Sequence, residues 1–148
     1  MKIKNKEIKP FFFELTKKDN KKFHSNIKTI LNKKNFILGD YTKSFETSFA
    51  KKNKSNFAIA VNSGTTALEI LISFNTKFKK NKIAVQSNTN FATIASIVRS
   101  NGYPVYLDMS LKYLCPTYEE VVKKYKKFKF SGLVWVHIGG IISPDFFL

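Results

Sequence analysis

Short apolar runs alternate with segments of helical periodicity from residue 57 onward, and this alternation constrains the fold more than any other feature of the sequence. The runs cover residues 57–61, 83–86, 104–108 and 133–137, and each has the length of a single strand. A connection that contains a helix is long enough to bring the chain back in a parallel direction. The order therefore predicts an α/β fold, with a largely parallel sheet and helices on both faces.

Within residues 57–148, individual residues predict where helices begin and end and which strand is buried. The helical segment 91–101 is expected to stop at Gly102 in a left-handed conformation. A later helix follows Thr117, which has the spacing of a capping box with Glu120. The run 57–61 (FAIAV) is apolar throughout, so we expect a strand that is buried on both faces.

Residues 1–56 have a different character. Apolar side chains at helical spacing predict a helix over residues 22–35, and a second helix follows that Asp40 or Thr42 can cap. We therefore divide the chain into an N-terminal helical lead-in and an α/β domain over residues 57–148. That domain is expected to be incomplete at its C-terminus, because no closing helix follows the last apolar run.

The formal net charge of +16 is typical of a protein that binds nucleic acid. Of the 26 basic residues, however, only Arg99 is arginine, and arginine is the residue that forms forked contacts with bases and phosphates. Lys, Asn, Ile and Phe dominate the composition and have A/T-rich codons, so codon bias is a sufficient explanation of the charge. A basic α/β module that binds nucleotides or nucleic acid remains an alternative function.

In an open α/β sheet the ligand lies at the carboxyl ends of the strands, so residues that follow the apolar runs are the candidates. The segment 62–66 (NSGTT) follows the first run and leads into a helix. Unpaired N–H groups at a helix N-terminus bind a phosphate, and Gly64 allows it to approach closely. Residues 57–76 carry a net charge of −1, so backbone and hydroxyl groups would hold it rather than lysines. The alternative is that Ser63 or Thr65 merely caps the helix.

Phe91 opens the next helical segment, where its ring can lie flat against a planar ligand or can pack in the core. Asp108 and His137 end later apolar runs, and neither is given a chemical role. The chain contains no Walker A or GxGxxG motif, which disfavours ATP hydrolysis and classical dinucleotide binding. It also contains no His, Cys, Asp and Glu cluster with metal-ligand spacing, so no metal site is expected.

The chain is expected to be cytoplasmic and not associated with a membrane. No apolar run approaches the roughly 20 residues that span a bilayer, and the N-terminus lacks the roughly 7–15 apolar residues of a secretory signal. Cys115 is the single cysteine and cannot form an internal disulfide, which fits a reducing compartment.

Four segments of the chain, taken in order, resemble successive motifs of one enzyme family. They are FILGDYTKSFETSFAKK, FAIAVNSGTTALEIL, QSNTNFATIASIVRSNGYPVYLD and VWVHIGG. Their order and spacing resemble the DegT/DnrJ/EryC1/StrS family of pyridoxal-phosphate-dependent sugar aminotransferases. The resemblance covers roughly residues 20–144 and implies the N-terminal part of the large domain of an aminotransferase of fold type I.

The resemblance assigns roles to residues that their chemistry alone left open. Gly64, Thr65 and Thr66 match the turn that holds the phosphate of the cofactor, pyridoxal 5′-phosphate. Phe91 matches the aromatic position that stacks on the pyridine ring, where many members carry Trp or Tyr. Gly39 lies in a loop that, in this family, helps to shape the sugar-nucleotide pocket.

The resemblance implies an enzyme that transfers an amino group, expected from glutamate, to a nucleotide-linked keto-sugar. It also implies that the full-length enzyme is a homodimer and acts in nucleotide-sugar and polysaccharide biosynthesis. Some members catalyse dehydration instead. Family members are more than twice this length, and neither the Asp that pairs with the pyridine nitrogen nor the Lys that binds the cofactor covalently has a matching motif here. The chain alone is therefore predicted to be inactive, and a nonfunctional fragment is a third interpretation.

Overall fold

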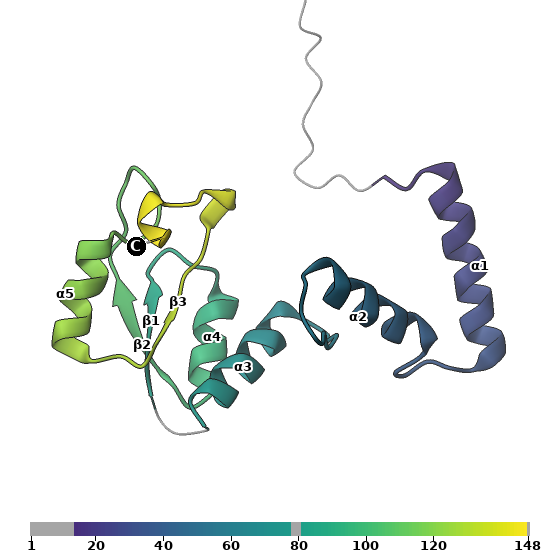
Figure 1. The fold of residues 1–148 in the computed structure, drawn as a ribbon, viewed down its shortest axis with the longest axis horizontal. Coiled ribbons are helices and arrows are strands. Elements are labelled where there is room, and N and C mark those ends of the chain that lie inside the picture. Colours follow the sequence, from purple (N-terminus) through teal and green to yellow (C-terminus); the bar gives the residue numbers. More distant parts are fainter. Residues whose placement is uncertain (1–13, 78–80, 148) are drawn as a thin grey trace, which may run out of the picture. The chain divides into compact units, whose positions relative to one another are not determined.

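The computed structural model describes residues 14–77 and 81–147, which form two compact units that divide between Ala60 and Val61. Among these residues, the first unit holds two helices, α1 (Lys17–Lys33) and α2 (Asp40–Lys52). The second unit alternates helices and strands (Figure 1). In chain order these are α3 (Gly64–Asn75), β1 (Lys82–Gln86), α4 (Phe91–Arg99), β2 (Tyr103–Leu107), α5 (Tyr118–Phe128) and β3 (Gly132–Val134), followed by short 3-10 turns at Ile138–Gly140 and Pro144–Phe147.

The three described strands form a parallel sheet in the order β2-β1-β3. Ala84, in the middle of β1, lies opposite Val105 on β2 and Leu133 on β3. Figure 1 shows α5 on one side of the strands, with α3 and α4 on the other. The chain leaves β1 toward β2 and then returns past β1 to β3. Because such crossovers are right-handed, this reversal puts α4 and α5 on opposite faces. The predicted α/β class, with a parallel sheet covered on both faces, is confirmed.

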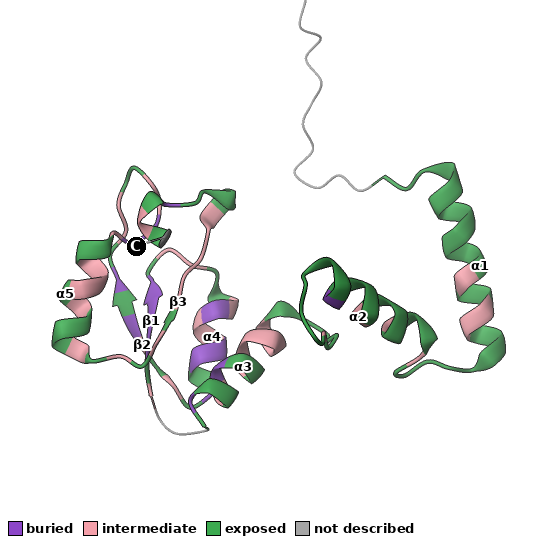
Figure 2. Cartoon of the chain, in the orientation of Figure 1, coloured by how far each residue is buried: buried purple, intermediate pink, exposed green. Residues whose placement is uncertain are grey.

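The core lies between the sheet and the helices of one face. Ile83 and Val85 of β1 pack with Ile72 of α3 and Ile97 of α4. The central strand β1 is buried from Ile83 to Gln86, as Figure 2 shows by colour. Burying an aliphatic side chain of this size stabilises the fold by about 1.5–3 kcal/mol relative to leaving it exposed. These contacts therefore anchor α3 and α4 to the central strand.

Strand β3 ends at Val134, earlier than the predicted run 133–137. Its backbone pairing with β1 stops at the pair Val85 and Val134. Beyond this pair the Val136 N–H donates to Oε1 of Gln86 at 3.1 Å. A side chain thus takes the place of the next backbone acceptor, which is why the regular strand stops although the sequence stays apolar.

The predicted buried strand at residues 57–61 is wrong. Within the described part of the chain this run pairs with no strand, and Phe57 and Ile59 are 86% and 83% exposed. The Ala60 N–H donates instead to Oε1 of Glu46 at 2.8 Å. A strand needs a neighbouring backbone to satisfy its N–H and C=O groups, and an apolar composition does not supply one.

Helix α1 starts before the predicted residue 22 because Thr16 caps it. The Thr16 side chain accepts a hydrogen bond from the Asp19 N–H at 3.1 Å. Many apolar side chains of α1 and α2 are exposed, among them Phe23 at 52% and Phe45 at 58%. None of the helices in the described ranges is long and apolar enough to cross a membrane.

The predicted cap of α2 is also wrong. Its N-cap is Gly39, which makes no side-chain capping bond, and neither Asp40 nor Thr42 takes that place. Asp40 instead lies in the first turn, where its carboxylate pairs with Nζ of Lys33 at 3.3 Å. Both side chains are exposed, so we expect this ion pair to contribute little to stability.

Of two predicted helix ends, the start of α5 is confirmed and the end of α4 is wrong. Thr117 caps α5 as predicted, because its hydroxyl accepts from the Glu120 N–H at 3.3 Å. After α4, however, the left-handed residue is Asn101, with φ 59°, and not Gly102. Gly102 is required for another reason, since a Cβ there would lie 2.8 Å from the carbonyl oxygen of Ile97.

Candidate functional site

The N-terminus of α3 keeps free hydrogen-bond donors. Ser63 is its N-cap, and the Ser63 hydroxyl accepts from the Thr66 N–H at 3.2 Å while its carbonyl accepts from the Ala67 N–H at 3.1 Å. The N–H groups of Gly64 and Thr65 have no acceptor among the described residues. Capping by Ser63, the alternative that the sequence left open, therefore occurs and still leaves two donors that suit a phosphate.

The space beside Gly64 is open. A Cβ built on Gly64 would meet nothing within 4 Å, and its backbone is not left-handed. The fold itself therefore does not require glycine here, and the missing side chain leaves open space against the backbone. The Thr66 hydroxyl lies 3.1 Å from that of Ser63, whereas the Thr65 hydroxyl has no hydrogen-bond partner in the described chain.

Two buried serines fix the register between α3 and α4. The Ser96 hydroxyl lies 3.0 Å from the carbonyl oxygen of Thr65, and the Ser100 hydroxyl donates to the carbonyl of Glu69 at 2.9 Å. Both contacts join residues that are 31 positions apart, so the two helices run side by side in the same direction. In this register Gly64 lies level with position 95 of α4. The N-terminus of α4 therefore projects about one turn, or ~6 Å along the helix axis, past the N-terminus of α3.

Phe91 is the first residue of α4. Along the helix axis it lies about one turn further toward the N-terminal side than the first residue of α3. Its side chain is 82% exposed, so the alternative of core packing is wrong. Asn90 caps the helix by accepting from the Ala92 N–H at 2.9 Å, and the buried Thr93 hydroxyl accepts from that of Thr89 at 3.0 Å. These bonds fix the turn that presents Phe91 at the carboxyl edge of the sheet.

Gln86, at the end of β1, links the segments that follow β1, β2 and β3, a role that was not singled out from the sequence. It ends β1 and is fully buried. Nε2 of Gln86 donates to Oδ1 of Asn88 at 2.8 Å and to the carbonyl of Leu114 at 3.4 Å, while Oε1 accepts from Val136. Leu114 follows β2 and Val136 follows β3. The available signal was a polar residue at the end of an otherwise apolar strand.

Two other strand-end residues make local contacts. The His137 ring packs edge-on against Phe146 with centroids 4.8 Å apart, and its buried Nδ1 has no partner in the described residues. Asp108 is exposed, with its carboxylate 3.7 Å from Nζ of Lys124. Its N–H donates to the Glu120 carboxylate at 3.2 Å, so Glu120 does not complete the predicted capping box. Across residues 14–77 and 81–147, no three potential metal-ligating side chains gather.

Gly39 belongs to the first unit, at the N-cap of α2. A Cβ there would lie 2.9 Å from the carbonyl oxygen of Asn35, so the backbone of this turn requires glycine. The turn thus explains Gly39 without a ligand. Its contribution to a substrate pocket stays a prediction.

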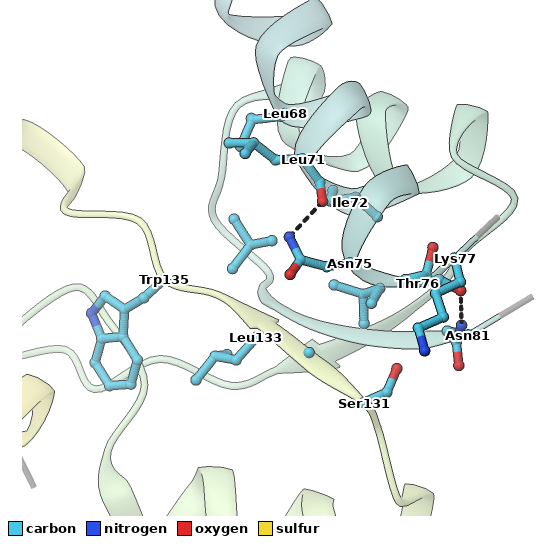
Figure 3. Close-up of a pocket in the computed structure, with 13 residues that line it drawn as sticks. Leu68, Leu71, Ile72, Asn75, Thr76, Lys77, Asn81, Ser131, Leu133 and Trp135 are labelled. Atoms are coloured by element: carbon cyan, nitrogen blue, oxygen red, sulfur yellow. Dashed lines mark hydrogen bonds between the residues drawn. The ribbon is translucent and has the colours of Figure 1, made fainter. Parts of the chain in front are cut away.

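A hollow of about 620 Å³ lies beside α3, β1 and β3 (Figure 3). Its wall includes Ile72, Leu133 and Trp135, and the Asn75 side chain in the same wall donates to the carbonyl of Leu71 at 2.7 Å. None of the predicted cofactor-binding residues lines it. The hollow is therefore not the predicted site, which lies at the helix N-termini.

The sequence profile of the DegT/DnrJ/EryC1/StrS aminotransferase family matches residues 17–146. The chain belongs to this family. Pyridoxal phosphate is the cofactor of the DegT/DnrJ/EryC1/StrS enzymes. The resemblance drawn from the four sequence segments is thereby confirmed.

The known relatives are much longer than this chain. GDP-perosamine synthase from Vibrio cholerae is 31% identical over 102 residues, which cover 69% of this chain and 28% of that protein. The structure of an aminotransferase from Psychrobacter cryohalolentis superposes with a TM-score of 0.69 at 25% identity, over 87% of this chain and 31% of the other. Escherichia coli GDP-4-keto-6-deoxy-D-mannose-3-dehydratase with bound hydrated pyridoxal phosphate gives a TM-score of 0.61 at 26% identity, over 68% and 27%. The chain thus spans less than a third of their length.

The donor set at the carboxyl edge fits this cofactor. The two N–H groups and one hydroxyl at the start of α3 suit a phosphate, and the open space beside Gly64 admits it. The exposed ring of Phe91, about one turn further along the helix axis, suits the face of a pyridine.

Proposed function

We propose that this chain contributes the phosphate-binding turn and the ring-stacking residue of a pyridoxal-phosphate-dependent aminotransferase. Gly64, Thr65, Thr66 and Phe91 form what we call the cofactor cradle. The register of α3 and α4 carries the proposal, because it places an exposed aromatic ring about one helical turn, or ~6 Å along the helix axis, beyond the free donors of the neighbouring helix. An aromatic ring and a set of anion-binding donors on adjacent helix N-termini suit a flat ring that carries a phosphate.

When bound, the cofactor supplies an electron-withdrawing ring that stabilises the negative charge left when a proton leaves the substrate carbon. The residues of this chain bind and orient it. The N–H groups of Gly64 and Thr65 and the Thr65 hydroxyl offset the phosphate charge without a lysine. Phe91 covers one face of the ring and excludes water from it. No lysine of this chain is given the covalent or the proton-transfer role.

The proposal extends to the whole enzyme. Its substrate would be a nucleotide-linked keto-sugar and its amino donor glutamate, and two relatives named for GDP-linked sugars support that substrate class. Amino transfer is the proposed reaction, supported by the similarity to the aminotransferase from Psychrobacter cryohalolentis, and dehydration is the alternative, since a GDP-4-keto-6-deoxy-D-mannose 3-dehydratase is also among the relatives. An α/β cofactor domain over residues 57–148, a homodimer, a part in polysaccharide biosynthesis and a cytoplasmic location complete the proposal.

The test is a titration of the 148-residue chain with pyridoxamine 5′-phosphate and, separately, with pyridoxamine. These amine forms are chosen because an aldehyde would react with the many lysines of the chain. The backbone amide resonances of Gly64 and Thr65 report binding by NMR. We expect them to shift with the phosphorylated compound and not with pyridoxamine. Equal binding of the two compounds, or shifts confined to other residues, would contradict the phosphate-binding turn.

A matched pair of variants tests the stacking residue. Phe91→Leu is expected to weaken binding of pyridoxamine 5′-phosphate by roughly 2- to 12-fold, which corresponds to about 0.5–1.5 kcal/mol for an aromatic pair. Phe74 is 76% exposed near the other end of α3, so Phe74→Leu makes the same change away from the cradle and should leave binding unchanged. Phe91→Tyr should bind as the wild type does. A loss of affinity shared by Phe91→Leu and Phe74→Leu would refute stacking.

A further inference from the structure

We infer that Ser96 is a positioning residue for the phosphate-binding turn, an inference that rests on the proposed function. Ser96 belongs to α4 and is fully buried. It does not reach the open space beside Gly64, so it is not a ligand of the phosphate. Its hydroxyl holds, from the α4 side, the peptide unit that adjoins the free donors of α3.

The peptide unit between Thr65 and Thr66 is held at both of its ends. Its carbonyl oxygen lies 3.0 Å from the Ser96 hydroxyl, and its N–H donates to the Ser63 hydroxyl at 3.2 Å. A peptide unit is planar and rigid, so contacts at opposite ends fix its orientation. The neighbouring N–H groups of Gly64 and Thr65 have no acceptor of their own in the described chain, and this fixed plane sets their direction.

The same hydroxyl also joins the two halves of the cofactor cradle. Besides the Thr65 carbonyl at 3.0 Å, it lies 2.7 Å from the carbonyl oxygen of Ala92, the residue next to Phe91, and its single proton is shared between these two acceptors. The first turn of α4, which presents the ring, and the first turn of α3, which presents the donors, therefore share one buried oxygen. The offset between the first turn of α4 and the free donors of α3 is therefore held at this point.

Ser100 provides the matched comparison. It is 3% exposed, and its hydroxyl donates to the carbonyl of Glu69 at 2.9 Å, one turn further from the donors. An ion pair of 3.1 Å between Glu69 and Arg99 also holds the helices together there. Removing either serine hydroxyl deletes one buried contact between α3 and α4, but only Ser96 contacts the donor turn.

The experiment compares Ser96→Ala with Ser100→Ala in the full 148-residue chain, by titration with pyridoxamine 5′-phosphate and with pyridoxamine. We expect Ser96→Ala to weaken binding of the phosphorylated compound by up to roughly 5-fold, the limit set by about one net hydrogen bond. The preference for the phosphorylated compound over pyridoxamine should fall by the same factor. Ser100→Ala should keep both the affinity and the preference, and hydrogen exchange of the β1 amides should change alike in the two variants.

The outcomes separate the inference from the proposed function. Equal affinity and equal phosphate preference in the two variants, with the wild type still preferring the phosphorylated compound, would overturn the role of Ser96 alone. A wild type without phosphate preference would overturn the proposed function and the inference together. If Ser96→Ala fails to fold, the pair Ser96→Cys and Ser100→Cys makes the same comparison, because a thiol keeps a weak donor in place. A lower phosphate preference in Ser96→Cys than in Ser100→Cys is then expected, and equal preference would refute the inference.

Discussion

Replacing Gln86 with methionine is expected to loosen the carboxyl edge of the sheet at one defined amide. Methionine has a similar volume, so the change leaves no large cavity, but it removes the acceptor of the Val136 N–H. The carbonyl of Leu114 keeps a bond of 3.0 Å from Nδ2 of Asn88 and is not orphaned. Oδ1 of Asn88 also loses its donor, so the cost falls on this half-buried oxygen and on the Val136 N–H, and a buried polar group left unsatisfied costs about 1–3 kcal/mol.

The assay is amide hydrogen exchange measured by NMR. A loss of about 2 kcal/mol corresponds to roughly 30-fold faster exchange at Val136. The amides of Ile83 and Val85, within the regular pairing of β1, serve as an internal reference and should change much less. Unchanged exchange at Val136 in the Gln86→Met variant, with β1 still protected, would refute the assignment of this bond.

Gln86→Glu provides the control, because it keeps an oxygen that can accept from Val136. The second carboxyl oxygen of the introduced Glu would take the place of the Gln86 Nε2 atom, which now donates to Asn88 Oδ1 and to the Leu114 carbonyl. Burial and these neighbours would raise the pKa of the introduced carboxyl above its unfolded value. The folded state then binds the proton more tightly, so stability is highest at low pH and is lost as pH rises through the folded pKa. Exchange at Val136 should therefore stay slow at low pH and, after correction for the intrinsic rate, become faster at neutral pH. A protection that does not vary with pH would contradict this account.

Three further predictions concern single residues. Gly64→Ala should raise stability by about 0.4–1 kcal/mol, because a Cβ there meets no atom, yet it should weaken binding of pyridoxamine 5′-phosphate; urea unfolding and titration measure the two effects. Gly39→Ala should lower the helix content of the first unit by circular dichroism, because its Cβ would crowd the Asn35 carbonyl. Ser63→Ala should cost about 0.5–2 kcal/mol, read as faster exchange at the Thr66 N–H.

The alternation of apolar runs and helical segments was sufficient to predict the parallel sheet, because each element there is decided by local pattern. Residues 83–86 and 104–108 differ from the observed β1 and β2 by no more than a residue at either end. The cap at Thr117 was predicted for the same reason, since a hydroxyl three residues before its N–H partner is a local feature.

Some errors are local and displace a helix end, as at the starts of α1 and α2 and the end of α4. The larger errors arise where the partner lies far along the chain. The run 57–61 has the composition of a buried strand, but pairing depends on a neighbouring edge that no local pattern reveals. The end of β3 depends on the Gln86 side chain, 50 residues before its donor Val136. The residues of the candidate site were predicted one by one. How Thr65 and Phe91 lie relative to each other depends on the register between α3 and α4, which no local sequence pattern reveals.

The Gln86 amide also implies an order of events during synthesis. Its bond to Val136 spans 50 residues, and the one to the Leu114 carbonyl spans 28. A ribosome that adds ~5–20 residues per second therefore needs roughly 3–10 s between making Gln86 and making the donor that completes its hydrogen bonds. During that interval β1 and β2 can already pair, while the amide at their ligand-facing edge lacks one partner. The edge on which the proposed cofactor site depends thus cannot be completed before residue 136 has been made.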